Sequence, residues 1–237
     1  MKEKHRYHVW DYVNIVVFYS IFLLFLVASI MGIVQLSKGQ IEAKDLIYRI
    51  LLTLLMCVPY LVKKIFRITF SRVVSIVYYL YMFLAGFLGV VLSFYVKVEW
   101  WDILIHFLMG LAVSVLSIYV LNLTVYKKDT SKHNLFFTFL FMLSFTMLVG
   151  VLWEILEFTG DAIFNMGYQR YVTYDGEVLI GRAVLIDTMT DLLMELGGAV
   201  MGIVFTVITK KIDKNFLKTF KIKKLKHLEP EIEDIEE

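Results

Sequence analysis

Apolar residues along this chain gather into six long stretches that are separated by short polar connections. The hydrocarbon core of a bilayer is about 30 Å thick, and a helix needs about 20 residues to cross it. Backbone groups inside lipid must find their hydrogen bonds within the protein, so each stretch is predicted to be a helix. The predicted spans are 12–36, 46–63, 73–96, 102–125, 134–158 and 186–209.

The composition of the chain agrees with a membrane protein. Of the 237 residues, 59% are hydrophobic and only 19% are charged, which is less charge than a soluble domain of this length carries. The predicted fold class is therefore all-α, a polytopic transmembrane bundle of about six helices. We expect the bundle to occupy residues 1–209 and a separate basic amphipathic segment with an acidic tail to follow at 210–237.

The distribution of charge predicts an orientation in the membrane. Lys and Arg crowd the N-terminus, the second and fourth connections and the segment after the last span, whereas the other connections are near neutral or acidic. The positive-inside rule then places both termini in the cytoplasm. Tyr95, Trp100 and Trp101 are expected in an outer aromatic belt. Residues 210–228 alternate Lys with apolar residues, which predicts a helix attracted to anionic membrane lipids.

Eight ionisable residues lie inside the last three spans or at their edges. Charged groups at membrane depth are costly and mark functional sites by default. The predicted orientation puts all eight in the outer half of the membrane, and within each span their spacing of three or four residues puts them on one helix face. The three clusters are Asp102 and His106; Glu154, Glu157 and Asp161; and Asp187, Asp191 and Glu195.

Small residues continue the same three faces toward the middle of the membrane. Gly110 follows His106, Gly150 precedes Glu154, and Gly198 and Gly202 follow Glu195 at helical spacing. Small residues let membrane helices approach closely. We therefore expect the polar faces to point at one another and to form one pocket.

Seven carboxylates in one partly dehydrated pocket cannot all remain ionised without a counter-charge. Carboxylate oxygens with one imidazole suit a divalent cation such as Mg²⁺, Mn²⁺, Fe²⁺, Zn²⁺ or Ca²⁺. The cofactor prediction is therefore a divalent metal ion. In an enzyme, Glu195 or Asp161 would be the catalytic base. The predicted metal ligands are Asp102, His106, Glu154, Glu157, Asp187 and Asp191.

Two alternatives to metal binding stay open for these residues. Asp102, Asp161 and Asp187 stand where helices are expected to begin or end, and capping is the simpler account of these three taken alone. The remaining five residues lie too deep for capping. For them the alternative is a bundle in which the carboxyl groups share protons and bind no metal.

The fifth connection, about 159–185, is the only sizeable outer segment. Two β-prone stretches flank Asp175 and Gly176, which predicts a small outer β-hairpin with a two-residue turn. Since it joins the two spans that carry six of the eight residues, it is either a cover for the pocket or a plain surface hairpin.

Three segments carry a resemblance to a known family. They are D-I-L-I-H-F-L-M-G at 102–110, W-E-I-L-E-F at 153–158 and D-T-M-T-D-L-L-M-E-L-G-G-A at 187–199. Over about 100–210 the chain resembles the YjdF-like bacterial inner-membrane proteins, a family of uncharacterised function. Asp191, Gly198 and Gly202 also have the spacing of a motif in VanZ-like membrane proteins, but Glu195 replaces the Asn of that motif. The resemblance implies a fold and a bacterial inner-membrane location, and it names no substrate.

Three classes of function remain open at this point. A metal-dependent enzyme would act on a lipid or lipid-linked substrate at the outer leaflet. A cation- or proton-coupled transporter would need ionisable groups through the whole membrane, and the inner halves of the last three spans have none. A non-catalytic scaffold or sensor would use the site only to stabilise the bundle. Expected partners are membrane lipids, and no nucleic acid.

Overall fold

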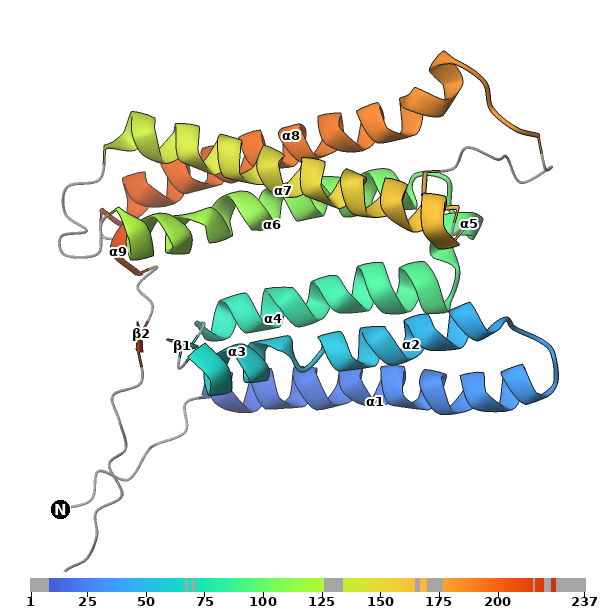
Figure 1. Ribbon diagram of the computed structural model, residues 1–237. Coiled ribbons are helices and arrows are strands. Elements are labelled where there is room, and N and C mark those ends of the chain that lie inside the picture. The colour runs from blue at the N-terminus through green and yellow to red at the C-terminus, as the bar shows by residue number, and fades with distance from the viewer. Residues whose placement is uncertain are drawn as a thin grey trace, which may run out of the picture. The chain divides into compact units, whose positions relative to one another are not determined.

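The computed structural model describes residues 9–66, 68–69, 71–125, 134–164, 167–169, 177–214, 216–219 and 223–224. In this part of the chain almost all regular structure is helical (Figure 1). The elements are α1 (Val9–Ser37), α2 (Ala43–Leu55), α3 (Val58–Phe66), β1 (Ile68–Thr69), α4 (Arg72–Tyr81), the π-helix η1 (Met82–Val91), α5 (Phe94–Lys97), α6 (Trp101–Thr124), α7 (Leu135–Phe164), α8 (Arg182–Ile212), α9 (Phe216–Thr219) and β2 (Lys223–Lys224).

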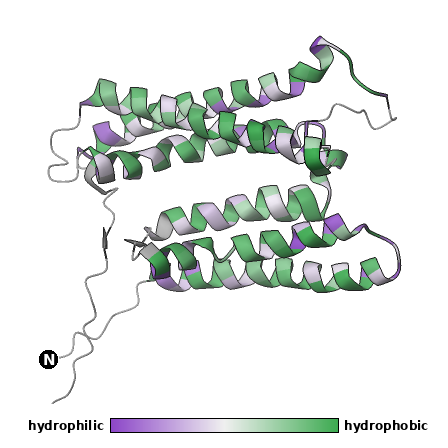
Figure 2. Ribbon diagram, in the orientation of Figure 1, coloured by the Kyte–Doolittle hydropathy of each residue, from purple (hydrophilic) through white to green (hydrophobic). Residues whose placement is uncertain are grey.

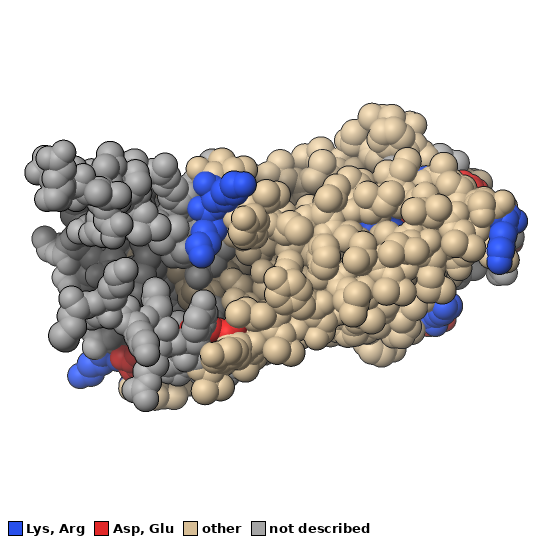
Figure 3. Space-filling model, turned by 90° about the horizontal axis from the view of Figure 1, so that it is seen from below, with Lys and Arg blue, Asp and Glu red and all other residues tan. Residues whose placement is uncertain are grey.

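Five helices among the described residues are long and apolar enough to cross a membrane, and a bent pair brings the number to six. The predicted all-α, multi-pass architecture is confirmed at this level. Hydrophobic residues dominate the long helices (Figure 2). On the face drawn in Figure 3, uncharged residues cover the middle, and most of the visible charged residues lie toward its two ends. The spans are Asp11–Ser37, Ala43–Leu55 with Val58–Ile65, Val74–Val91, Trp101–Asn122, Leu135–Phe164 and Arg182–Ile212.

The chain forms two compact units, which are described separately. The first comprises Met1–Ile76 and Ile222–Glu237, and the second comprises Val77–Lys221. In the first unit, β1 pairs antiparallel with β2, with Ile68 opposite Lys224. In the second unit, α6, α7 and α8 pack against one another, and α6 packs most extensively against α8.

The second predicted span is bent where a continuous helix was expected over 46–63. Helices α2 and α3 meet at a break of 50°. Pro59 is the second residue of α3; it has no N–H, and its ring would clash with the carbonyl of Leu55 in an unbroken helix. The bend therefore follows from one residue within an otherwise apolar run.

Polar contacts join α2 to α1 inside the first unit. Nη1 of Arg49 donates hydrogen bonds to Oε1 of Gln35 at 2.8 Å and to the carbonyl of Ala28 at 3.3 Å. The hydroxyls of Ser29 and Thr53 lie 3.0 Å apart across the same pair of helices. A charged group within a span needs such partners, and here α1 supplies them.

The third span also differs from its prediction over 73–96. Its second half is the π-helix η1, in which the backbone N–H of Leu92 donates to the carbonyl of Phe87, five residues earlier. Ser93 has a φ of 61°, in the left-handed region, and this residue separates η1 from the short helix α5. The span therefore ends at Val91, five residues before the predicted boundary.

Glycines allow α6 and α8 to approach closely, as the sequence predicted. A Cβ on Gly110 would collide with the backbone of Glu195, and a Cβ on Gly198 would collide with the carbonyl of Phe107. On α7, a Cβ on Gly150 would collide with the Glu195 carboxylate. These contacts place Glu195 where the three helices meet, so the small residues position the acidic faces.

The segment after the last span is only partly described. Helix α8 continues through Lys210 and Lys211 to Ile212, and α9 follows after Asp213. The side-chain amide of Asn122 on α6 donates to the carbonyl of Leu217 on α9 at 3.0 Å, in a buried position. The acidic tail, the greater part of the predicted amphipathic segment, and the predicted hairpin turn at 175–176 lie outside the described residues.

Candidate metal site

Three helices bring ionisable side chains to one end of the second unit. Helix α6 begins at this end, α7 ends there and α8 begins there (Figure 1). His106 lies in the second turn of α6, Glu154 two-thirds of the way along α7 and Asp191 in the third turn of α8. The three predicted clusters therefore meet in space, although they are far apart in sequence.

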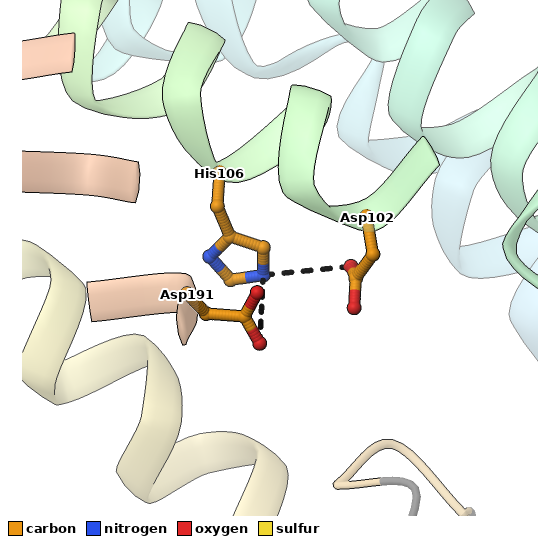
Figure 4. Close-up of side chains that lie close together, drawn as sticks. All are labelled: Asp102, His106 and Asp191. Atoms are coloured by element: carbon orange, nitrogen blue, oxygen red, sulfur yellow. Dashed lines mark ion pairs between the residues drawn. The ribbon is translucent and has the colours of Figure 1, made fainter. Parts of the chain in front are cut away.

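His106 is at the centre of this arrangement. Its side chain is only 4% exposed. Its Nδ1 lies 3.1 Å from Oε1 of Glu195, at hydrogen-bonding distance, and in this pair the ring N–H is the donor to a carboxylate. Its Nε2 lies 3.6 Å from Oδ1 of Asp102 and 3.9 Å from Oδ2 of Asp191 (Figure 4). The ring is thus held on one side by Glu195 and faces two carboxylates on the other.

Asp102, His106 and Asp191 form a group that can hold a metal ion. Each offers one ligand atom, and these three atoms all lie within 4.8 Å of one another. With metal–ligand bonds of about 2.1 Å, opposite ligands of a bound ion stand about 4.2 Å apart. Small rotations of the carboxylates would therefore close the group around an ion. A ligating His that donates its other ring N–H to a carboxylate is the usual arrangement in metal sites.

Glu154 enters the same pocket from α7. The residue is 6% exposed, and neither of its carboxylate oxygens makes a hydrogen bond within the described residues. The side chain of Thr188 is near this carboxylate but outside hydrogen-bonding geometry. Oε2 of Glu195 is likewise buried without a hydrogen-bond partner there. Because a buried polar group without a partner costs free energy, these oxygens mark a place that a cation or a proton would fill.

Glu157 and Asp187 lie at the edge of this pocket. Both are half-buried, and both are close enough to the buried acids for their charges to interact. Oε1 of Glu157 accepts a hydrogen bond from the indole N–H of Trp153 at 2.8 Å. The structure thus brings all six predicted ligands together, and three of them form the tightest group.

Asp161 makes its hydrogen bonds to the segment that follows α7. Its two carboxylate oxygens accept the backbone N–H groups of Tyr168 at 2.8 Å and of Gln169 at 2.9 Å. The side chain therefore ties the chain that leaves α7 back to the helix. Its predicted catalytic role, like that of Glu195, stays a prediction.

Capping, the alternative role, is wrong for Asp102 and Asp187. The N-cap of α6 is Trp100 and that of α8 is Gly181, so Asp102 is the second residue of its helix and Asp187 the sixth. Helix α8 starts before its apolar core because residues 182–186, Arg-Ala-Val-Leu-Ile, are compatible with helix. Both aspartates therefore lie within their helices, on the turns that border the pocket.

Aromatic residues also lie near the ionisable cluster. Trp100 is 57% exposed, whereas Trp101 is buried and packs edge-on against Phe94 with ring centroids 5.0 Å apart. Tyr81, at the end of α4, is close enough to Glu195, Asp102 and Glu157 for their charges to act on its hydroxyl. Nothing in the sequence indicated that Tyr81 lies near these carboxylates, because a tyrosine is common within an apolar span.

Comparison with known proteins gives one match. Residues 16–211 match the family model described as "Predicted membrane protein (DUF2238)". The match covers well over half of the chain, so the chain belongs to this family of predicted membrane proteins. No curated protein and no solved structure matches it.

Proposed function

We propose that this member of the DUF2238 family binds a divalent metal ion through Asp102, Asp191 and Nε2 of His106. The observation that carries the proposal is the convergence of these three ligand atoms within 4.8 Å, two from α6 and one from α8. The hydrogen bond from Nδ1 of His106 to Glu195 supports it, because this bond directs the lone pair of Nε2 toward the two carboxylates.

The donor set narrows the class of metal. Two carboxylates favour hard cations such as Mg²⁺ and Mn²⁺, whereas an imidazole favours Fe²⁺ and Zn²⁺. A mixed set of oxygen and nitrogen ligands suits Mn²⁺, Fe²⁺ and Zn²⁺ best. Mn²⁺ and Zn²⁺ are therefore the first ions to test.

We place this site on the extracytoplasmic side of a bacterial inner membrane, with both chain termini inside. The support is the distribution of basic residues. Lys210 and Lys211 lie at the opposite end of α8 from Asp191, and the positive-inside rule puts that basic end in the cytoplasm. The resemblance to YjdF-like inner-membrane proteins agrees with this location.

An enzyme acting on a lipid or lipid-linked substrate is the chemistry that this position supports best. The pocket lies near one end of the spans, with Asp102 in the first turn of α6 and Glu157 and Asp187 half-buried at its edge, so a headgroup entering from the membrane surface can reach it. A bound divalent cation would polarise a phosphoryl oxygen or activate water. In such an enzyme the proposed catalytic base is Glu195 or Asp161; Glu195 also contacts His106, and Asp161 also binds the segment that follows α7.

Cation or proton transport, the alternative function, finds little support along the inner halves of α6 and α8. The buried hydroxyls there bond to carbonyls of their own helices: Ser114 to Leu111 at 2.9 Å, and Thr206 to Gly202 at 2.8 Å. Groups bound in this way do not form a chain of ligands across the membrane. A site confined to one end favours binding or catalysis there.

The test uses the full-length protein in detergent and measures affinity for Mn²⁺ and Zn²⁺ by titration calorimetry. Asp191→Asn is expected to weaken binding by at least about tenfold. Asp213→Asn serves as the control, because Asp213 follows the far end of α8, about 30 Å away at 1.5 Å per residue. Wild-type protein that binds neither ion more tightly than Asp191→Asn would overturn the proposal.

The enzymatic function needs a separate assay. Turnover of a phospholipid or an undecaprenyl-linked substrate by wild type, lost in Asp191→Asn, would establish the enzyme.

A further inference from the structure

The pocket contains three buried carboxylate oxygens that the metal group of Asp102, His106 and Asp191 does not use. They are Oε1 and Oε2 of Glu154 and Oε2 of Glu195, and none of them has a hydrogen-bond partner within the described residues. Glu154 is 6% exposed and Glu195 is 1% exposed. Water therefore does not supply the missing bonds from the surface, and something inside the pocket must.

These oxygens belong to the α7 side of the pocket, because Glu154 is on α7 and Oε2 of Glu195 contacts it. Oε2 of Glu195 sits against Gly150, at the place where a Cβ would be. Glu154 follows Gly150 by four residues on the same helix, so it lies one turn further along the same face of α7. The charges of Glu154 and Glu195 are close enough to interact. Two buried carboxylates, one from α7 and one from α8, thus lie within reach of each other's charge.

Glu195 joins this place to the metal group. Its Oε1 accepts the hydrogen bond from His106, while its Oε2 points away from the imidazole toward α7. The Glu195 carboxylate therefore has one oxygen beside the metal group and the other on the α7 side of the pocket. Whatever binds Oε2 is coupled through Glu195 and His106 to an ion at Nε2.

Charge balance indicates which ligand binds beside Glu154 and Oε2 of Glu195. A divalent ion held by Asp102 and Asp191 is neutralised by these two ligands, which leaves the negative charges of Glu154 and Glu195 uncompensated in a dehydrated place. A single shared proton would supply one hydrogen bond and cancel one of the two charges. A second divalent cation cancels both and gives each carboxylate a partner.

We propose that the pocket holds two divalent cations, the second one between Glu154 and Oε2 of Glu195, with Glu195 linking the two positions. This inference rests on the proposed function, since the first ion neutralises Asp102 and Asp191. It extends that function by giving the site two metal ions. Two cations in one pocket favour an anionic substrate over a neutral one, so the inference narrows the substrate class to headgroups that carry negative charge, such as phosphate.

The experiment measures metal content after equilibrium dialysis of the full-length protein against Mn²⁺, by mass spectrometry of the metal and quantitative amino-acid analysis. Wild type is expected to hold two ions per chain and Glu154→Gln one. Glu42→Gln, an exposed glutamate in the first unit, is the matched control and should hold two. Electron paramagnetic resonance of wild type loaded with Mn²⁺ gives an answer without any variant, because two ions in one pocket broaden each other's spectra through dipolar coupling.

The outcomes separate the two proposals. One ion in wild type that Glu154→Gln retains, with the spectrum of isolated Mn²⁺, would overturn the second position and leave the proposed function standing. No ion in wild type would overturn both. Two ions in wild type, one in Glu154→Gln and a coupled spectrum would support both.

Discussion

Nδ1 of His106 and Oε1 of Glu195 lie 3.1 Å apart across the contact between α6 and α8. This hydrogen bond joins residues that are 89 positions apart in the chain, and both side chains are almost completely buried. With a hydrogen on Nδ1, Nε2 is the ring atom that can ligate an ion, and it faces Asp102 and Asp191. Glu195 is therefore the positioning residue of the proposed metal site.

Glu195→Gln is expected to weaken divalent-metal binding about 10- to 100-fold, the usual effect of removing a carboxylate behind a ligating His. The amide keeps the size of the side chain but is a weaker acceptor and no longer selects one tautomer. Titration calorimetry measures the affinity, and ¹⁵N spectra of the labelled imidazole report which nitrogen carries the proton. An unchanged tautomer with unchanged affinity would contradict the positioning role.

Two adjacent glycines of α8 provide a matched pair for the close approach of α6. A Cβ on Gly198 would collide with the backbone of α6, whereas a Cβ on Gly197 would rest 3.8 Å from the ring of Phe107, an ordinary contact. Gly198→Ala is expected to lower stability by about 1–3 kcal/mol, the cost of overpacking. Gly197→Ala should be neutral or slightly stabilising. Unfolding curves in detergent measure both, and equal effects of the two substitutions would refute the packing argument.

Gly150→Ala tests the α7 side of the pocket with less damage to the backbone. The new methyl group would collide with the end of the Glu195 side chain, which can rotate away. The expected result is weaker metal binding with a smaller loss of stability than in Gly198→Ala. The comparison of affinity and unfolding in these two variants is the measurement. Binding of Mn²⁺ at wild-type strength in Gly150→Ala would show that the position of the Glu195 carboxylate does not matter.

Asp161→Ala separates a loop contact from the metal site. The substitution removes the acceptor for the N–H groups of Tyr168 and Gln169, at a cost of about 1 kcal/mol for each exposed or partly exposed bond. Faster hydrogen exchange at these two amides is expected, while metal content stays at the wild-type value. Loss of metal from Asp161→Ala would show that Asp161 does contribute to metal binding.

The helices and their polar faces could be predicted from the sequence because each leaves a regular pattern of residue types along the chain. The cost of exposing backbone and charge to lipid marks the spans, so the six predicted stretches agree with five long helices and one bent pair. Helical spacing marks the faces, and the glycines that follow them are where α6, α7 and α8 meet. The convergence of Asp102, His106 and Asp191 follows from these two patterns together.

Other features depend on single atoms that a hydropathy pattern does not register. The missing N–H of Pro59 bends the second span, and the backbone shift in η1 leaves no mark in composition. The role of Glu195 depends on which nitrogen of His106 it contacts. The loop role of Asp161 depends on backbone groups seven and eight residues away. These features appear only when the helices are placed beside one another.

X-ray absorption at the metal edge tests the central claim most directly. Protein loaded with Zn²⁺ or Mn²⁺ is expected to show oxygen ligands together with the outer-shell scattering of one imidazole, and this imidazole contribution should vanish in His106→Ala while oxygen ligands remain. Wild-type protein that retains no metal, or a spectrum that His106→Ala leaves unchanged, would contradict the account.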